Sequence, residues 1–260
     1  MAFTLYLLAA LGGVFAGFIT TLAGLGSVLT LYILIDVLGL DADVANGTNR
    51  IGIMAMCITA LPSFHKKGHL QVKKSWPIIA TIFTGAMMGL ALALNVDNKS
   101  FKIIFKYLLF VMLFMALVNP SEPKNGANEN HTLNWFIALP VFLTIGFYAG
   151  FIQAGTGVFM VISLAMIGRY SLLDANGIKL ATFSLYSLVA IVLFAWTDKI
   201  DWGVGLALAI GQGIGAYVTA RVATSYPKAN VYVRYLLIIV ILLAIVRMFE
   251  LHNVVANWID

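Results

Sequence analysis

Charged residues are scarce in this chain, and their scarcity decides the class of protein. Only 10% of the 260 residues are Asp, Glu, Lys or Arg, whereas 61% are hydrophobic, and the mean hydropathy is +0.95. A soluble domain carries about 25% charged residues and about 45–50% apolar residues. The composition therefore excludes an ordinary soluble domain and indicates an integral membrane protein.

Other features that carry chemistry are missing as well. The single cysteine, Cys57, excludes an internal disulfide. The sequence places no cluster of His, Asp, Glu or Cys at membrane depth and has no nucleotide-binding loop, so we expect no metal, no cofactor, no direct ATP drive and no enzyme activity. The net charge of +5 comes from short loops, which is typical of cytoplasmic loops rather than of a nucleic-acid interface.

What the chain does have is a series of apolar runs. Runs of about 20 residues recur along it, and each is long enough to cross a hydrocarbon core of about 30 Å as a helix. The N-terminus lacks a basic segment before its first run, so we expect that run to belong to the mature membrane domain. The sequence thus predicts an all-α integral membrane protein with many crossings.

Two glycine-rich stretches interrupt these runs at matching places. Residues 13–19 are followed by Ala23-Gly24-Leu25-Gly26, and residues 146–152 are followed by Ala154-Gly155-Thr156-Gly157. Glycine permits a positive φ, so each cluster predicts a break at the tip of a helical hairpin, either re-entrant or fully spanning. Broken backbone at membrane depth must be buried in protein or line a watery cavity, and matching breaks in two halves indicate a transporter's binding site.

The second half of the chain repeats the first. Ala175-Asn176-Gly177 follows Ala45-Asn46-Gly47 at an offset of 130 residues, and the Gly-x-x-x-Gly spacing of 85–89 returns at 211–215. Several matches in the same order indicate an internal duplication. We predict a first transmembrane repeat over 1–118, a cytoplasmic linker rich in Pro, Asn and charge over 119–131, and a second repeat over 132–260. Each repeat would be a hairpin followed by three transmembrane helices.

Loop charges set the predicted orientation. The loop that carries Lys66, Lys67, Lys73 and Lys74 is strongly basic and is placed in the cytoplasm. In the second half the loop around Arg221 is the most basic, which puts equivalent loops of the two halves on opposite faces. The sequence therefore predicts inverted-topology repeats in a multi-pass protein of the bacterial cytoplasmic membrane.

These patterns resemble a known family. The glycine-rich hairpin over 17–26, the helix segment Ala45-Asn46-Gly47-Thr48 and the basic loop over 66–70, all repeated, are similar to the TauE/SafE family of sulfite exporter-like permeases. The resemblance covers nearly the whole chain. It implies an all-helical inverted-repeat permease for small anions such as sulfite or organosulfonates. The chain departs from the family's fullest pattern in lacking a proline after each hairpin glycine cluster and a Thr-Ser pair before Lys179.

Two cations are the leading candidates for binding an anion. Arg50 and Lys179 occupy nearly equivalent places in the two repeats, each near a predicted helix start where free N–H groups and the positive dipole end favour an anion. The planar fork of arginine suits sulfonate or carboxylate oxygens. The alternative is an interfacial position, with Arg50 snorkelling or paired with Asp43 and Lys179 facing the cytoplasm.

The full predicted substrate site joins these cations to the hairpin tips and the neighbouring polar side chains. At the tips, the alternative is simple packing of glycine between helices. The predicted substrate-binding residues are Gly24, Gly26, Ser27, Asn46, Thr48, Asn49, Arg50, Gln153, Gly155, Thr156, Gly157, Asn176 and Lys179.

We therefore expect a secondary transporter, with export as the expected direction, that alternates access to a small anion around a site near the membrane midplane. The membrane potential or coupling to protons or another ion would drive it, and a homo-oligomer in the lipid bilayer is compatible with the sequence. Two other functions stay open: an anion channel, and a membrane scaffold subunit that does not transport.

Overall fold

The computed structural model describes residues 2–117, 133–222 and 229–249, and the elements within these ranges are all helices. The predicted all-α class is thereby confirmed, while the linker predicted over 119–131 lies outside the described residues. The first half contains α1 (Ala2–Ala23), α2 (Gly26–Tyr32), the π-helical turn η1 (Ile33–Val37), α3 (Ala42–Lys66), α4 (Val72–Asn95) and α5 (Asn98–Leu117). The second half contains α6 (Trp135–Phe151), α7 (Thr156–Met166), α8 (Leu172–Trp196), α9 (Trp202–Val222) and α10 (Ala229–Met248).

Helix length and composition fit a protein that crosses the membrane several times. Within the described residues, four helices are long and apolar enough to span a bilayer: α1, α4, α8 and α9. The pieces of the two hairpins that follow or precede the breaks are apolar but shorter, over Gly26–Val37, Trp135–Phe151 and Thr156–Met166. The first hairpin therefore joins α1, which is long enough to span, to a shorter piece, whereas both pieces of the second hairpin are shorter.

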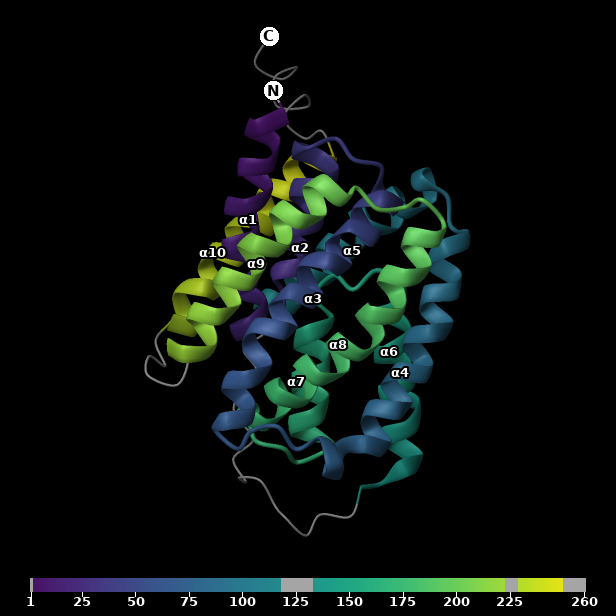
Figure 1. Ribbon diagram of the computed structural model, residues 1–260. Helices are drawn as coiled ribbons and strands as arrows, with labels where there is room; N and C mark the ends of the chain where they lie inside the picture. The colour runs from purple at the N-terminus through teal and green to yellow at the C-terminus, as the bar shows by residue number, and fades with distance from the viewer. Residues whose placement is uncertain (1, 118–132, 223–228, 250–260) are drawn as a thin grey trace.

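The two halves pack by exchanging helices. Helix α1 lies along α9 on one side of the molecule, α6 lies along α4 on the other, and α3 contacts α8 near the centre (Figure 1). The glycine spacing makes this approach possible, because a Cβ on Gly17 would lie 2.3 Å from the Gln212 carbonyl oxygen. Likewise, a Cβ on Gly150 would lie 1.9 Å from the Ala86 carbonyl oxygen. Small residues thus let helices of opposite halves touch backbone to backbone.

The central helices contact the opposite half in a reciprocal way. A Cβ on Gly47 of α3 would lie 2.0 Å from the Lys199 carbonyl oxygen, and a Cβ on Gly177 of α8 would lie 2.1 Å from the His69 carbonyl oxygen. Gly177 follows Gly47 by 130 residues, and Lys199 follows His69 by the same 130 residues, so the two contacts join equivalent positions of the two halves. This reciprocal packing is what a duplicated chain gives. The opposite orientation of the two repeats in the membrane stays a prediction.

Candidate functional site

Both predicted hairpin breaks are present. Helix α1 ends at Ala23 and α2 begins at Gly26, while α6 ends at Phe151 and α7 begins at Thr156. Gly24 and Gly155 have φ angles of +75° and +67°, in the left-handed region that a residue with a Cβ rarely adopts. The two breaks therefore arise where the sequence places glycine at the required turn.

The two breaks touch one another. A Cβ on Gly24 would lie 2.5 Å from the carbonyl carbon of Gly157, so only glycine fits there. The Ser27 hydroxyl donates to the Gln153 carbonyl oxygen at 3.1 Å and accepts from the Gly155 N–H at 3.2 Å. Two hairpins more than a hundred residues apart in the chain thus form one joined unit at their tips.

Arg50 holds the end of one broken helix. Its side chain is fully buried, and its two terminal nitrogens donate to the carbonyl oxygens of Ala149 at 2.9 Å and Gly150 at 2.8 Å. The Asn46 amide donates to the next carbonyl, that of Phe151, at 2.8 Å. Carbonyls in the last turn of a helix have no partner within the helix and carry partial negative charge. The guanidinium fork therefore caps the C-terminus of α6.

Lys179 has the corresponding position at the other break. It is also fully buried, and its ammonium donates to the Thr20 carbonyl oxygen at 3.0 Å in the last turn of α1. It also donates to the Asn176 side-chain oxygen at 2.6 Å. Each central helix thus supplies a cation and an asparagine near the break of the opposite half. A role of these residues in binding a substrate stays a prediction.

One part of the sequence interpretation is wrong. Helix α3 begins at Ala42, and α8 begins at Leu172 after Ser171, whose hydroxyl caps it by accepting from the Asp174 N–H. Arg50 and Lys179 therefore lie in the third turn of their helices, where backbone N–H groups are bonded within the helix. The dipole ends that these cations meet are the negative C-termini of α6 and α1. The residues that precede the observed helix starts are Asp41 and Ser171, which lie in the connectors that follow the two hairpins.

Two of the glycine N–H groups at the tips already donate hydrogen bonds within the protein. The Gly24 N–H donates to the Thr20 carbonyl oxygen at 3.0 Å, and the Gly155 N–H is bonded to Ser27. These two groups close the protein's own breaks instead of facing a ligand.

Among the residues that the structure describes, the buried cations have no carboxylate partner. Within the described ranges the ion pairs are His69 with Asp174, Lys199 with Asp43, and Arg247 with Asp36. Asp43 therefore does not pair with Arg50, and the fully buried Arg50 and Lys179 are not interfacial side chains. The hydrogen-bond partners of both cations in this part of the chain are neutral oxygens. A buried charge without a counter-charge is costly, and an anion between the breaks would offset that cost.

Several buried polar atoms around the breaks lack any hydrogen-bond partner among the described residues. Most buried polar groups in proteins are hydrogen-bonded, so unpaired ones are available to a ligand or a water molecule. The cluster comprises Nε of Arg50, Nδ2 of Asn49, Oε1 of Gln153, Oε1 of Gln212 and the hydroxyls of Thr20, Thr156 and Ser187.

Sequence reasoning did not select three residues of this region. Thr20 and Ser187 are single hydroxyls in apolar runs, a pattern that helix packing produces equally often, so no signal in one sequence separates them. The Tyr186 hydroxyl accepts from the Gln153 amide at 2.9 Å, and its ring centroid lies 6.0 Å from the Arg50 guanidinium carbon. Tyr186 thus links the second break to the cation.

Two predicted residues have other partners. The Thr48 hydroxyl accepts from the Asp201 N–H at 2.9 Å and so fixes the start of α9. The Asn49 side-chain oxygen accepts from the Thr30 hydroxyl at 2.8 Å, which joins α3 to the first hairpin. The Thr48 side chain therefore has a structural role at the start of α9.

A multi-helix membrane protein with paired broken helices and buried cations at its centre belongs to the class of membrane transporters. The sequence matches the family described as "Sulfite exporter TauE/SafE" over residues 9–248, so this chain is a member of the TauE/SafE family. The predicted family is confirmed.

Curated relatives agree with that class. The chain is 28% identical to "Probable membrane transporter protein ORF9" of Sinorhizobium sp, over 90% of this chain and 88% of that protein. It is 27% identical to a "Probable membrane transporter protein" of Haemophilus influenzae, over 83% and 84% of the two chains. It is 25% identical to "Probable membrane transporter protein YfcA" of Escherichia coli K12, over 86% and 82%. No solved structure matches this chain.

The Ser27 bridge generates the first prediction. Ser27→Ala removes the hydroxyl, which leaves the Gly155 N–H without its hydrogen-bond partner and the Gln153 carbonyl with a long bond from the Thr156 N–H at 3.4 Å. We therefore expect the free energy of unfolding to fall by about 1–2 kcal/mol. Ser184→Ala is the matched control, because the Ser184 hydroxyl bonds only the Ala181 carbonyl of its own helix. Reversible unfolding in mixed micelles measures both. Equal stability of the two variants would show that the hairpin tips are not joined through Ser27.

Proposed function

We propose that this protein is a secondary transporter of a small oxyanion in the bacterial cytoplasmic membrane, with sulfite as the first substrate to test and export as its direction. One observation carries the proposal: two fully buried cations, Arg50 and Lys179, stand at the joined helix breaks with no carboxylate partner among the described residues. The charge of the substrate follows from the cations. Its sulfur chemistry is supported by the family's description alone.

The burial of the site supports a small substrate. Apart from the half-buried Asn176, the thirteen predicted binding residues are all buried, and the two tips are in backbone contact. Tips that approach this closely would limit a substrate bound beside them to an anion of a few atoms. Unpaired donors on Arg50, Asn49, Thr20 and Thr156 would replace part of its hydration. A closed arrangement of this kind favours a carrier with an occluded state over a continuously open channel.

Two ion pairs provide a basis for alternating access. Asp43, in the first turn of α3, pairs with Lys199 at 3.2 Å, and His69, which follows the last turn of α3, pairs with Asp174 at 2.9 Å. Helix α3 has 25 residues, so it is about 37 Å long and the two pairs lie at opposite ends of it. Each pair joins a central helix to a loop of the other half. Opening one pair while the other stays closed would give the site access to one side.

The membrane potential favours export of an anion. A negative interior drives a negative charge outward with about 2.3 kcal/mol per elementary charge per 100 mV. A monovalent anion therefore needs no second driving ion to leave the cell, and coupling to protons would add to this drive. The proposed direction follows from the sign of the substrate charge.

An unpaired hydroxyl gives a sharp test of binding. Thr156→Val removes the hydroxyl but breaks no hydrogen bond within the described protein, so stability without ligand should stay unchanged. Loss of a bond to the anion should weaken the apparent affinity for sulfite about tenfold, measured as sulfite-dependent thermal stabilisation of the purified protein. Thr219→Val is the control, since the buried Thr219 hydroxyl bonds the Gly215 carbonyl of its own helix at 2.7 Å.

Charge variants complete the same experiment. Arg50→Gln and Lys179→Gln should abolish the stabilisation by sulfite, whereas Arg247→Gln should preserve it because Arg247 already pairs with Asp36. Sulfate, thiosulfate and acetate are run in parallel to define the anion class. Stabilisation that survives in both charge variants, or an absence of stabilisation by all four anions, would contradict the proposed site.

The two ion pairs generate a prediction about transport. Asp43→Asn and Asp174→Asn each weaken the ion pair at one end of α3. A partly buried ion pair contributes about 1 kcal/mol, which changes the ratio of the closed to the open conformation about fivefold. We expect each variant to slow sulfite exchange in proteoliposomes about fivefold while leaving sulfite-dependent stabilisation in place. Asp36→Asn is the control, because its partner Arg247 lies on α10.

Exchange of the two charges tests whether the pair itself matters. Asp43→Lys combined with Lys199→Asp should recover most of the lost exchange rate. Equal slowing by Asp36→Asn, or no recovery in the charge-swapped protein, would contradict the role of these pairs in access.

A further inference from the structure

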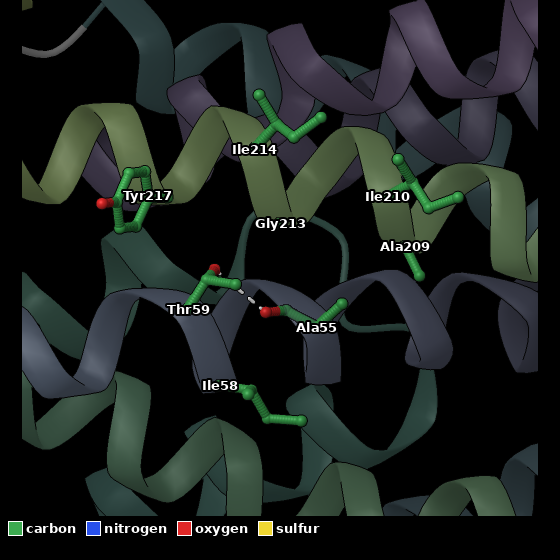
Figure 2. A pocket seen from close by; sticks show the side chains of 8 residues that line it. All are labelled: Ala55, Ile58, Thr59, Ala209, Ile210, Gly213, Ile214 and Tyr217. Atoms are coloured by element: carbon green, nitrogen blue, oxygen red, sulfur yellow. Dashed lines mark hydrogen bonds between the residues drawn. The ribbon is translucent and has the colours of Figure 1, made fainter.

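A groove opens on the outer surface between α3 and α9, away from the helix breaks. Its walls include Ala55, Ile58 and Thr59 of α3 and Gly213, Ile214 and Tyr217 of α9 (Figure 2). The cavity volume is about 460 Å³. The groove is therefore large enough to hold part of a chain-like molecule, and nothing in the proposed transport cycle uses it.

The groove is apolar and faces outward. Ile58 and Ile214, on its two walls, are 60% and 53% exposed. It runs along α9, which is long and apolar enough to span a bilayer, so the hydrocarbon of the membrane surrounds it. An acyl chain is the molecule that such a surface meets there.

Small residues at the base create the open space. A Cβ on Gly213 would lie 3.5 Å from Thr59 Cγ2, an ordinary contact distance. At the neighbouring Gly211, by contrast, a Cβ would lie 2.0 Å from the Ala10 carbonyl oxygen. Gly211 is therefore needed to pack α9 against α1, whereas Gly213 leaves a space that a larger side chain could fill.

One end of the groove is strongly basic. Helices α3 and α9 run in parallel here, since Gly205 lies near Thr48 and the Lys67 ammonium donates to the Ala220 carbonyl oxygen at 3.1 Å. Their C-terminal ends thus meet and bring together three exposed cations, Lys66, Lys67 and Arg221. We call these three residues the basic cluster.

The basic cluster adjoins the groove directly. The Arg221 guanidinium carbon lies 4.4 Å from the centroid of the Tyr217 ring, which is one of the groove walls. Lys66 and Arg221 form no ion pair within the described residues. A negative group seated on this cluster would therefore be continuous with an acyl chain in the groove.

We propose that this surface binds one anionic phospholipid, with an acyl chain in the α3–α9 groove and the phosphate on the basic cluster. Such a lipid joins an apolar chain to a negative head, which matches the two parts of the surface in order. A second copy of the chain is a poorer match, because the protein has a net charge of +5 and only 11 acidic residues with which to meet the cluster. Anionic lipids attract basic residues at the membrane surface in the same way.

Native mass spectrometry of the delipidated protein, with phosphatidylglycerol or phosphatidylethanolamine added in a neutral detergent, tests this directly. We expect one retained phosphatidylglycerol and much weaker retention of phosphatidylethanolamine. Lys66→Gln with Arg221→Gln removes two cations, each of which raises the affinity for an anionic lipid about fivefold near the membrane surface. The double variant should therefore bind phosphatidylglycerol about thirtyfold more weakly. Lys73→Gln with Lys74→Gln is the matched control, since these exposed cations lie at the start of α4 in the same basic loop.

Filling the groove tests the acyl chain separately. Gly213→Leu should reduce retention of phosphatidylglycerol at least as strongly as the loss of charge, and Ala209→Leu on the same wall serves if the first variant does not fold. Equal retention of both lipids, equal loss in the Lys73/Lys74 control, or full retention in a folded groove-filled variant would each overturn the proposal. A lipid-free dimer that protects the groove residues would assign the surface to a second copy and overturn it as well.

Discussion

The arrangement of this protein depends on two buried cations that hold the ends of two broken helices. Helix ends buried in a membrane protein need partners for their last carbonyls, because no water is present to supply them. Arg50 and Lys179 supply those partners for α6 and α1 from the opposite side of the molecule's centre. These hydrogen bonds stabilise the two breaks inside the protein, where their tips are in backbone contact. The same cations bring a positive charge that the described residues do not neutralise.

Glycine and charge have separate tasks in this design. The glycines on α1, α6, α4 and α9 let helices of opposite halves approach backbone to backbone, which fixes the outer walls. The ion pairs at the two ends of α3 join the central helices to loops of the other half. Steric fit also holds the central helices, because Gly47 and Gly177 lie against carbonyl oxygens of the opposite half. The ion pairs at the ends of α3 are the polar contacts that the proposed change of access would break and re-form.

Much of the fold was predictable from the sequence. Apolar runs gave the helices, glycine clusters gave both breaks, and the repeated Asn-Gly pair pointed to the central crossing where Gly47 and Gly177 meet loops of the opposite half. The importance of Arg50 and Lys179 was also visible, since charge in an apolar run is rare. Their partners were not. Which carbonyl a buried cation hydrogen-bonds depends on how helices far apart in the chain pack together, and a local sequence pattern does not predict that packing.

The missed features share this cause. The start of α3 at Ala42 was hidden because the connector before it is polar without a strong cap, and the Asp41 side chain forms no capping bond. Thr20 and Ser187 look like any hydroxyl in a membrane helix, and their lack of a partner is a property of the packed structure alone. The groove between α3 and α9 likewise arises from two helices far apart in the chain. Sequence patterns define elements, whereas unpaired polar atoms and grooves belong to the assembled molecule.

Binding of an anion at the two joined breaks can be observed in a structure. The most direct measurement is a crystal structure with selenite, the heavier analogue of sulfite, located by the anomalous scattering of selenium. We expect one selenium peak, with the selenite oxygens within about 3.5 Å of Arg50 Nε and the Thr156 hydroxyl. A selenium peak elsewhere in the membrane domain, or a site that stays empty at concentrations that stabilise the protein, would contradict it.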